Sequence, residues 1–356
     1  MNIALLNLPV DDNYGGNLQR YALFKVLQNM GHDVTHILVM RKWTVVSPKI
    51  LLSVVKRLVL KLFFHKDVVL FAERKAQKEN CANFNRIAPF YNRYIKHTEP
   101  IYNYESLKKI GLYDAYVVGS DQVWRKKIVE PFPLKMFFGD FIHHSAKRIA
   151  YAVSLGNDEP ELEKKEADFL EKFYNKFYKV SVREKSALNL LNQYGWNNPK
   201  ADWLLDPTLL LKKEDYIELI NASQTSLPTE KLFCYILDLT KEKQNVIETV
   251  SKEKGLRPFI TGLHEISIEQ WLRNIAEAEF IVTDSYHGFV FSIIFNKPVR
   301  LLFNKYRGNA RFESILKMLD MFDFQQNFDW AKINQIICVE REKSLNWLKN
   351  ALETSD

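Results

Sequence analysis

The sequence contains little cysteine and lacks a long uncharged apolar run. Its cysteines, Cys81, Cys234 and Cys338, are odd in number and far apart, so they support neither a disulfide framework nor a zinc site. No apolar run approaches the roughly 18 residues that suggest a membrane span. The N-terminus also lacks a basic region ahead of an apolar one. We therefore expect a cytoplasmic protein without a transmembrane helix or a secretory signal.

The composition is that of a globular protein with an excess of positive charge. Hydrophobic residues make up 47% and charged residues 26% of the 356 residues, and low-complexity segments and internal repeats are absent. A chain of this length is long for a single core, so two domains are expected. The net charge of +7 suits nucleic acid, an anionic membrane or an anionic substrate.

Apolar strand candidates alternate with helical stretches along most of the chain. They form one series at 3–6, 34–39, 115–118, 148–153, 180–182 and 203–205, and a second at 232–237, 258–260, 280–283 and 299–302. Such alternation predicts an α/β fold with two Rossmann-like domains facing a cleft. We expect the domains at 1–210 and 231–335, a linker at 211–230 and a C-terminal helix within 336–356.

The positive charge is concentrated in an insertion at about 41–66. On a helix starting near Pro48, Lys49, Lys56, Arg57 and Lys61 share one face with a serine, and the rest of the surface is apolar. Acidic residues are missing until Asp67. This pattern favours peripheral contact with an anionic membrane. The alternative is an ordinary helix that packs on the protein and turns its basic face to solvent.

The segment 280–294 carries the main candidate for catalysis. An apolar strand, a short polar turn and a second apolar run place His287 in the first turn of a helix that follows a buried strand. Ligands of open α/β sheets bind beyond the carboxyl ends of the strands, and helix N-termini attract anions. A titratable ring beside an anion site is the outline of an active site, although a single His near a strand end is more often structural.

The opening of the chain repeats this arrangement. A strand at 3–6 is followed by a loop with Gly15 and Gly16 and then by an amphipathic helix. The two glycines allow the backbone to approach a ligand closely. The spacing is not that of a dinucleotide-binding loop.

Several motifs occur in a fixed order along most of the chain. They are NYGGNLQRYAL at 13–23, YDAYVVGSDQVW at 113–124, AYAVSLG at 150–156, VSVREKS at 180–186, LDPTLL at 205–210, TDSYHG at 283–288 and NAR at 309–311. Together they resemble the bacterial polysaccharide pyruvyl transferases. Two departures are Arg125, where many relatives have Asn, and Ser285, where some have Arg. The second leaves the number of arginines at the donor phosphate open.

The resemblance implies a glycosyltransferase-B-like fold and transfer of pyruvate from phosphoenolpyruvate, a co-substrate, to two hydroxyls of a sugar. No cofactor is implied. His287 would be the general acid, because protonating the enol carbon of the donor requires one. Arg183 and Arg311 would hold the donor phosphate and carboxylate, assisted by Ser285 and the amides near Gly288. The acceptor, expected to be a lipid-linked oligosaccharide on the inner face of the membrane, is assigned to Asn13, Tyr14, Gly15, Gly16, Gln19 and Asp121.

Each assignment has a structural alternative. Arg183 stands beside Glu184 and fits a surface ion pair, and Arg311 fits a position on a helix face. Asp121 could simply cap a turn. Asp206, which precedes a proline, is typical of a turn, and we expect a structural role for it. No His, Asp and Glu cluster suggests a metal site.

Other functions remain open at this stage. A glycosyltransferase that uses a nucleotide sugar would share the fold and the phosphate site. A non-catalytic, membrane-associated glycan-binding component would have no need of His287 beside an anion site. Binding of nucleic acid is disfavoured, because the basic residues gather on an apolar helix and not among exposed aromatic residues.

Overall fold

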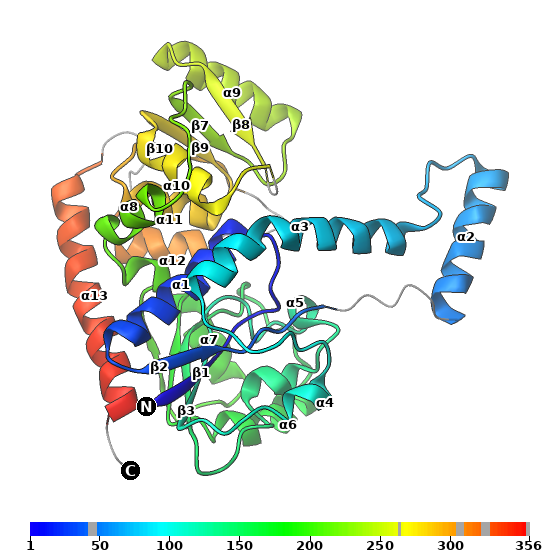
Figure 1. Ribbon diagram of the computed structural model, residues 1–356, viewed down its shortest axis with the longest axis vertical. Helices are drawn as coiled ribbons and strands as arrows, with labels where there is room; N and C mark the ends of the chain where they lie inside the picture. Colours follow the sequence, from blue (N-terminus) through cyan, green and yellow to red (C-terminus); the bar gives the residue numbers. More distant parts are fainter. Residues whose placement is uncertain (42–47, 263–264, 304–309, 322–327, 354–356) are drawn as a thin grey trace.

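Two units, each built on a parallel sheet, form the body of the protein (Figure 1). The computed structural model describes residues 1–41, 48–262, 265–303, 310–321 and 328–353. Residues 42–47 of the predicted basic insertion lie outside this description. None of the described helices is both long and apolar enough to cross a bilayer.

The first unit contains a sheet with the strand order β2-β1-β3-β4-β5-β6. Its elements are β1 (Asn2–Leu6), α1 (Tyr14–Asn29), β2 (Asp33–His36), α2 (Pro48–Phe64), α3 (Ala72–Tyr94), α4 (Tyr104–Leu107), β3 (Ala115–Val118), α5 (Lys126–Val129), η1 (Leu134–Phe138), β4 (Lys147–Val153), α6 (Lys164–Tyr174), β5 (Lys179–Val182), α7 (Lys185–Gln193), β6 (Ala201–Trp203) and η2 (Pro207–Leu209). The order reverses between β1 and β3, so the loops after these two strands diverge there and leave room for a ligand.

The second unit contains a smaller sheet with the strand order β10-β9-β7-β8. Its elements are α8 (Lys213–Asn221), β7 (Leu232–Tyr235), α9 (Lys241–Lys254), β8 (Pro258–Thr261), α10 (Ile268–Glu277), β9 (Phe280–Thr283), α11 (Tyr286–Ile294), β10 (Val299–Leu301) and α12 (Ala310–Met318). Helix α11 is buried along its whole length. It follows β9 at the point where the strand order of this sheet reverses.

The predicted architecture of two facing Rossmann-like units is confirmed by these two parallel sheets, and the predicted strands are found with ends shifted by a few residues. One difference lies in the expected linker. Part of it forms α8, whose residues Tyr216, Leu219 and Ile220 are buried. These apolar residues recur at helical spacing, which explains why the segment folds onto the body instead of running free.

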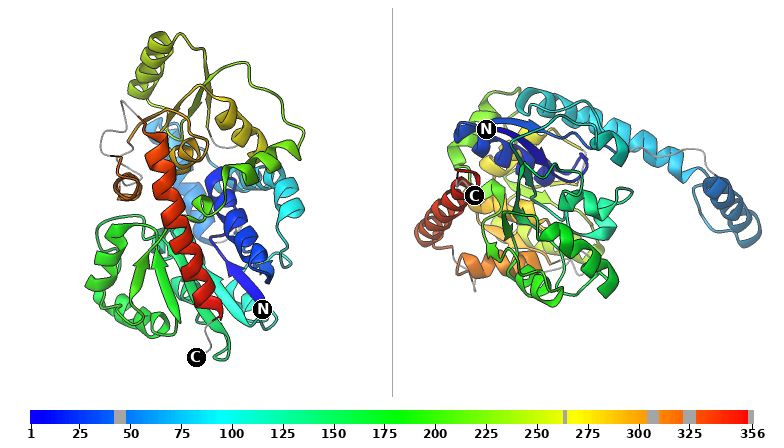
Figure 2. Two further views of the ribbon diagram at one scale, coloured as in Figure 1. Left: turned by 90° about the vertical axis from the view of Figure 1, so that its left-hand side faces the viewer. Right: turned by 90° about the horizontal axis from the view of Figure 1, so that it is seen from below.

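Helix α13 (Trp330–Glu353) runs along both units (Figure 2). Its Arg341 donates to the carbonyl oxygens of Leu209 and Leu211, and its Trp347 donates to Asp202 at 2.7 Å. The apolar Ile333 and Ile337 are buried in the core that both units share. The helix therefore holds the second unit to the first at a fixed place.

Candidate active site

His287 lies where the two units meet. It is the second residue of α11, and the N-cap Ser285 accepts a hydrogen bond from the amide of Gly288. The imidazole is 7% exposed. Its Nε2 atom is 3.6 Å from the Oδ2 atom of Asp206 in the first unit, and among the described residues it makes no hydrogen bond. A residue of the second unit thus has an acidic partner in the first.

Gly15 packs against the other side of this ring. A Cβ atom at this position would lie 2.1 Å from Nδ1 of His287, which no side chain could tolerate. The same test at Gly16 finds nothing closer than 3.8 Å. The first glycine of the pair therefore makes room for the catalytic candidate itself.

Asp206 is a buried centre of hydrogen bonds. It caps η2, and its Oδ1 atom accepts from the amide and the hydroxyl of Thr208 at 3.0 and 2.7 Å. Its Oδ2 atom accepts from Arg183 at 2.8 Å and from Gln19. Burial alone would raise the pKa of this carboxyl, but the nearby His287, with Arg183 and Thr208, holds the pKa well below its usual range. Asp206 is therefore a permanent negative charge beside the imidazole.

Arg183 is buried within this cluster, with a side chain that is 1% exposed. This excludes the surface ion pair considered from the sequence. Besides its bond to Asp206, Arg183 is 3.3 Å from Asp121 and 3.8 Å from Glu184. Burial alone would lower the pKa of the guanidinium, but the neighbouring carboxylates, led by Asp206, raise it. The side chain is charged at every working pH.

Arg311, at the start of α12, supplies a second guanidinium. Its Cζ atom lies 5.7 Å from the centre of the Tyr286 ring, and that of Arg183 lies 4.9 Å from the same ring. Burial and the positive charge of Arg183 both lower the pKa of Arg311. Both guanidinium groups thus lie near one aromatic ring, and such a pair of cations favours a bound anion.

Asp121 follows β3 at the reversal point of the first sheet. Its side chain is 21% exposed, more than those of Arg183 and Asp206. Burial would raise its pKa, but Arg183, His287 and Arg311 lower it further than burial raises it. An ionised carboxylate thus faces both the cations and the solvent.

The other residues assigned to the acceptor have contacts of their own. The side chain of Asn13 caps α1 by accepting from Gly16, and Gln19 is buried between Asp206 and Ser120. The hydroxyl of Tyr14 donates to the carbonyl oxygen of Ile266, and its ring stacks on Trp271 of the second unit. Their acceptor roles stay predictions. Gln19, Asp121, Gly15 and Gly16 are the members of this set that lie at the His287 cluster.

Sequence reasoning missed Asp206, Glu184 and Tyr286. Asp206 was expected to be structural, and it does cap a short helix, but the same carboxylate contacts His287 and Arg183. The sequence did indicate the place of Asp206, because this residue follows a candidate strand of the sheet that also carries Arg183. Residues after parallel strands gather at one sheet edge.

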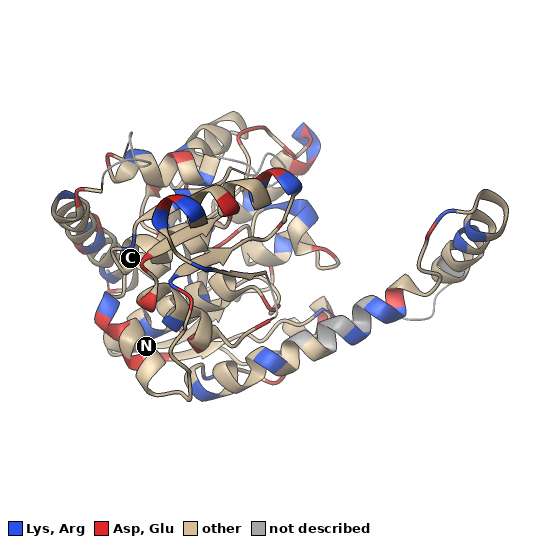
Figure 3. Ribbon diagram, turned by 90° about the horizontal axis from the view of Figure 1, so that it is seen from above, with Lys and Arg blue, Asp and Glu red and all other residues tan. Residues whose placement is uncertain are grey.

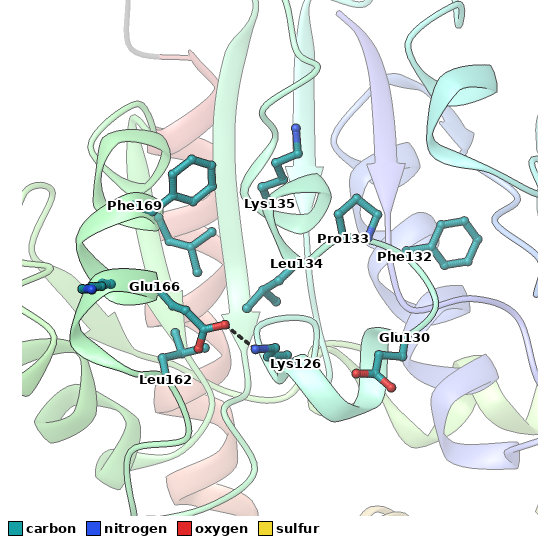
Figure 4. Close-up of a pocket in the computed structure, with 11 residues that line it drawn as sticks. Lys126, Glu130, Phe132, Pro133, Leu134, Lys135, Leu162, Glu166 and Phe169 are labelled. Carbon is teal, nitrogen blue, oxygen red and sulfur yellow. Dashed lines mark hydrogen bonds and ion pairs between the residues drawn. The ribbon is translucent and has the colours of Figure 1, made fainter.

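One cavity lies close to this cluster, and another lies apart from it. One of about 370 Å³ is lined mainly by polar residues of α7 and α12, including Lys185 and Glu313, which lie two residues after Arg183 and Arg311 in the sequence. The other, of about 410 Å³, lies between α6 and η1 and is mainly apolar, with Lys126 paired to Glu166 at its edge (Figure 4). It contains none of the residues around His287. No group of three or more potential metal ligands occurs in the described part of the chain.

Comparison with solved structures finds proteins whose polypeptide chain follows a similar path, at low sequence identity. The heptosyltransferase WaaC of E. coli with ADP is 14% identical, with 84% of this chain and 86% of that chain covered and a TM-score of 0.35. The UDP-GlcNAc 2-epimerase from Methanocaldococcus jannaschii is 11% identical, with coverage of 95% and 99% and a TM-score of 0.46. Similarity at this level bears on neither substrate nor activity.

No curated protein matches the chain. The family model for polysaccharide pyruvyl transferase matches residues 13–305, which is most of the sequence. The match begins at the cap of α1 and spans Asp121, Arg183, Asp206 and His287. The chain belongs to the polysaccharide pyruvyl transferase family.

Proposed function

We propose that the protein transfers pyruvate from phosphoenolpyruvate to two hydroxyls of a sugar in a surface-polysaccharide precursor, such as that of a capsule or exopolysaccharide. The products are a cyclic pyruvate ketal and phosphate. The observation that carries this proposal is that His287 and Arg183 both approach the carboxylate of Asp206, with Arg311 near the same Tyr286 ring as Arg183, where the carboxyl ends of both sheets meet. Family membership supports a transferase that acts on a polysaccharide.

The proposed reaction starts with a proton transfer. His287, as imidazolium, protonates the methylene carbon of the donor, which becomes a methyl group and leaves an oxocarbenium-like centre. A first sugar hydroxyl attacks this centre and gives up its proton, which returns to the imidazole. The phosphate then leaves with its bonding electrons, and the second hydroxyl closes the ketal ring as it gives its own proton to the departing phosphate. His287 thus acts first as acid and then as base.

Donor binding follows from the arrangement of charges. The phosphate and the carboxylate of phosphoenolpyruvate face Arg183 and Arg311, which offer planar sets of donors. The contact of Arg183 with Asp121 at 3.3 Å is longer than that with Asp206 at 2.8 Å. A donor anion displaces the longer contact. The released Asp121 carboxylate then faces the acceptor hydroxyls.

Asp206 is a positioning residue in this scheme. Its carboxylate lies 3.6 Å from the Nε2 atom of His287, and the ring is held between that carboxylate and Gly15. Because Asp206 also bonds Arg183, one buried group sets the acid and a donor-binding arginine relative to each other. This is the logic of an acid oriented by a third side chain.

The proposed acceptor is a lipid-linked oligosaccharide, and the protein meets it through peripheral contact with an anionic membrane. The basic helix α2 supports this contact, since its sequence contains lysines and an arginine but no Asp or Glu. We assign no role to nucleic acid.

Phosphate release from phosphoenolpyruvate tests the proposal. The purified protein is incubated with a panel of lipid-linked and synthetic glycosides, and phosphate is measured against a control without acceptor. Acceptor-dependent release is expected. Binding of UDP or ADP without any release from phosphoenolpyruvate would instead support a nucleotide-sugar glycosyltransferase.

A further inference from the structure

Helix α2 stands away from the body of the protein, at the far end of the long helix α3 (Figure 1). One side of α2 consists of large apolar residues that are 41–75% exposed, namely Leu51, Leu52, Val55, Leu58, Val59, Leu62 and Phe63. Their spacing of three and four residues places them on one continuous face of the helix. The alternative considered from the sequence, a helix packed on the protein itself, does not hold for this apolar face.

The opposite side of α2 faces the turn that leads into α3. Arg57 lies on this side and donates to both carboxylate oxygens of Glu73 at 2.6 and 2.7 Å, and to the carbonyl oxygen of Leu70 at 3.3 Å. This two-bond ion pair joins α2 to the start of α3. Arg57 therefore holds the helix in place, in contrast to its expected role as a free lipid-binding charge.

Lysines flank the apolar face. At 100° per residue, Lys56 falls next to Phe63 at one edge of the face, and Lys61 falls beyond Leu58 at the other. Both lysines are exposed. Figure 3 shows Lys and Arg along α2 without an acidic residue on the helix. Lysines at the edges of an apolar face can extend their charged ends to phosphate groups while their stems cover apolar surface.

An apolar face of this extent normally has a partner. A second copy of the helix is disfavoured as that partner, because two copies of α2 would bring four flanking lysines together with no acid on either helix to pair with them. A membrane surface with anionic headgroups satisfies the apolar face and the lysines at once.

We propose that α2 lies in the surface of an anionic membrane with its apolar face inserted below the headgroups, held at a fixed angle to α3 by the Arg57–Glu73 pair. The inference deepens the membrane contact of the proposed function and rests on it. Insertion of apolar side chains is the main attachment, and the lysines add a salt-sensitive part. The body is thereby held beside the membrane at the distance that α3 spans.

Co-sedimentation with vesicles tests this inference. The vesicles contain equal parts of phosphatidylglycerol and phosphatidylcholine, and the variant is Leu58→Gln with Leu62→Gln. The matched control is Leu112→Gln with Leu227→Gln, which changes two leucines elsewhere that are more exposed, at 78% and 68%, than Leu58 and Leu62 at 42% and 60%. We expect the α2 variant to bind at least about tenfold more weakly, and the control to bind like the wild type.

The charges are tested separately. Lys56→Gln with Lys61→Gln should remove the part of the binding that salt suppresses, while a salt-resistant part remains. Equal sedimentation of the wild type and the Leu58, Leu62 variant would overturn the inference. The inference would also be overturned if the wild type did not bind the vesicles and eluted as a dimer that the Leu58, Leu62 variant dissociates.

Two further measurements keep the test decisive. The single change Leu62→Gln, at an exposed position, replaces the double variant if that variant does not fold. Phosphate release by the wild type on a water-soluble acceptor tests pyruvyl transfer without vesicles. Absence of phosphate release would contradict the proposed chemistry and leave the result of the vesicle experiment valid.

Discussion

At the scale of single residues, the proposed reaction depends on the carboxylate of Asp206, which positions His287. The two side chains come within 3.6 Å across the junction of the units. Replacing Asp206 by Asn removes the negative charge beside the imidazole but keeps the size of the side chain. The kcat should then fall by at least about tenfold, because an acid that is not held in place loses part of its contribution.

Thr208→Val is the control for this change. It removes the 2.7 Å hydrogen bond from the hydroxyl to Asp206 but keeps the carboxylate. Its kcat should stay within about twofold of the wild type, even if its melting temperature falls. An unchanged kcat in the Asp206→Asn variant would limit Asp206 to a structural role.

The donor arginines are tested by replacement with lysine. Arg183→Lys and Arg311→Lys keep the positive charge but lose the planar pair of donors. The KM for phosphoenolpyruvate should rise in both variants. A fall in melting temperature with an unchanged KM would show that the altered arginine serves folding and not the donor.

At the scale of elements, helix α1 contributes to the site through Gly15, the glycine that faces His287. Gly15→Ala would place a methyl group within 2.1 Å of the imidazole and must displace the ring. We expect the kcat to fall by at least about a hundredfold, because a misplaced acid loses most of its contribution.

Gly16→Ala is the matched test in the same helical turn. Its added methyl group meets nothing closer than 3.8 Å, and Ala within a helix is favoured over Gly by roughly 0.5–1 kcal/mol. This variant should be as stable as the wild type or more so, with most of its activity. Equal activity of the two alanine variants would show that the contact between Gly15 and His287 has no role.

The elements also show how far the sequence predicts the site. Apolar runs buried on both sides mark β3, β4 and β9, so the residues after them, including His287, could be placed at the carboxyl edges of the sheets. The place of Asp206 at the same sheet edge as Arg183 could be predicted, but its contact with His287 could not. Its local signal is that of a turn, and the contact with His287 exists only once α11 of the other unit is in place.

The same limit applies to α2 and to Gly15. Periodicity predicted the helix and its charges, but no local pattern indicated that Arg57 pairs with Glu73 in α3. The glycine pair predicted a close approach of the backbone, but the group that approaches Gly15 is an imidazole from a distant segment. Contacts between units lie beyond what local patterns can show.

The carboxylates of the site make the stability of the whole molecule depend on pH. The pKa values of Asp206 and Asp121 in the folded protein are lower than in an unfolded chain, where an aspartate titrates at about 4. Their contribution is complete above that value. It is lost as the pH falls toward the folded pKa values, because the unfolded chain takes up protons first.

Denaturant unfolding at pH 6 and at pH 4 measures this loss. The free energy of unfolding of the wild type should fall more between these two values than that of the Asp206→Asn variant, which has one such carboxylate fewer. Parallel losses in the two proteins would contradict the assigned ionisation of Asp206.

The two units together create the proposed activity, because the acid comes from the second and Asp206, Asp121 and Arg183 come from the first. The most direct test compares the wild type with His287→Gln under saturating phosphoenolpyruvate and an accepted glycoside. Phosphate release and the NMR signal of the ketal methyl group are followed together. The account predicts equal amounts of phosphate and ketal from the wild type, and a rate at least about a hundredfold lower from the variant with donor binding retained. Ketal formation by the variant within threefold of the wild-type rate would contradict it.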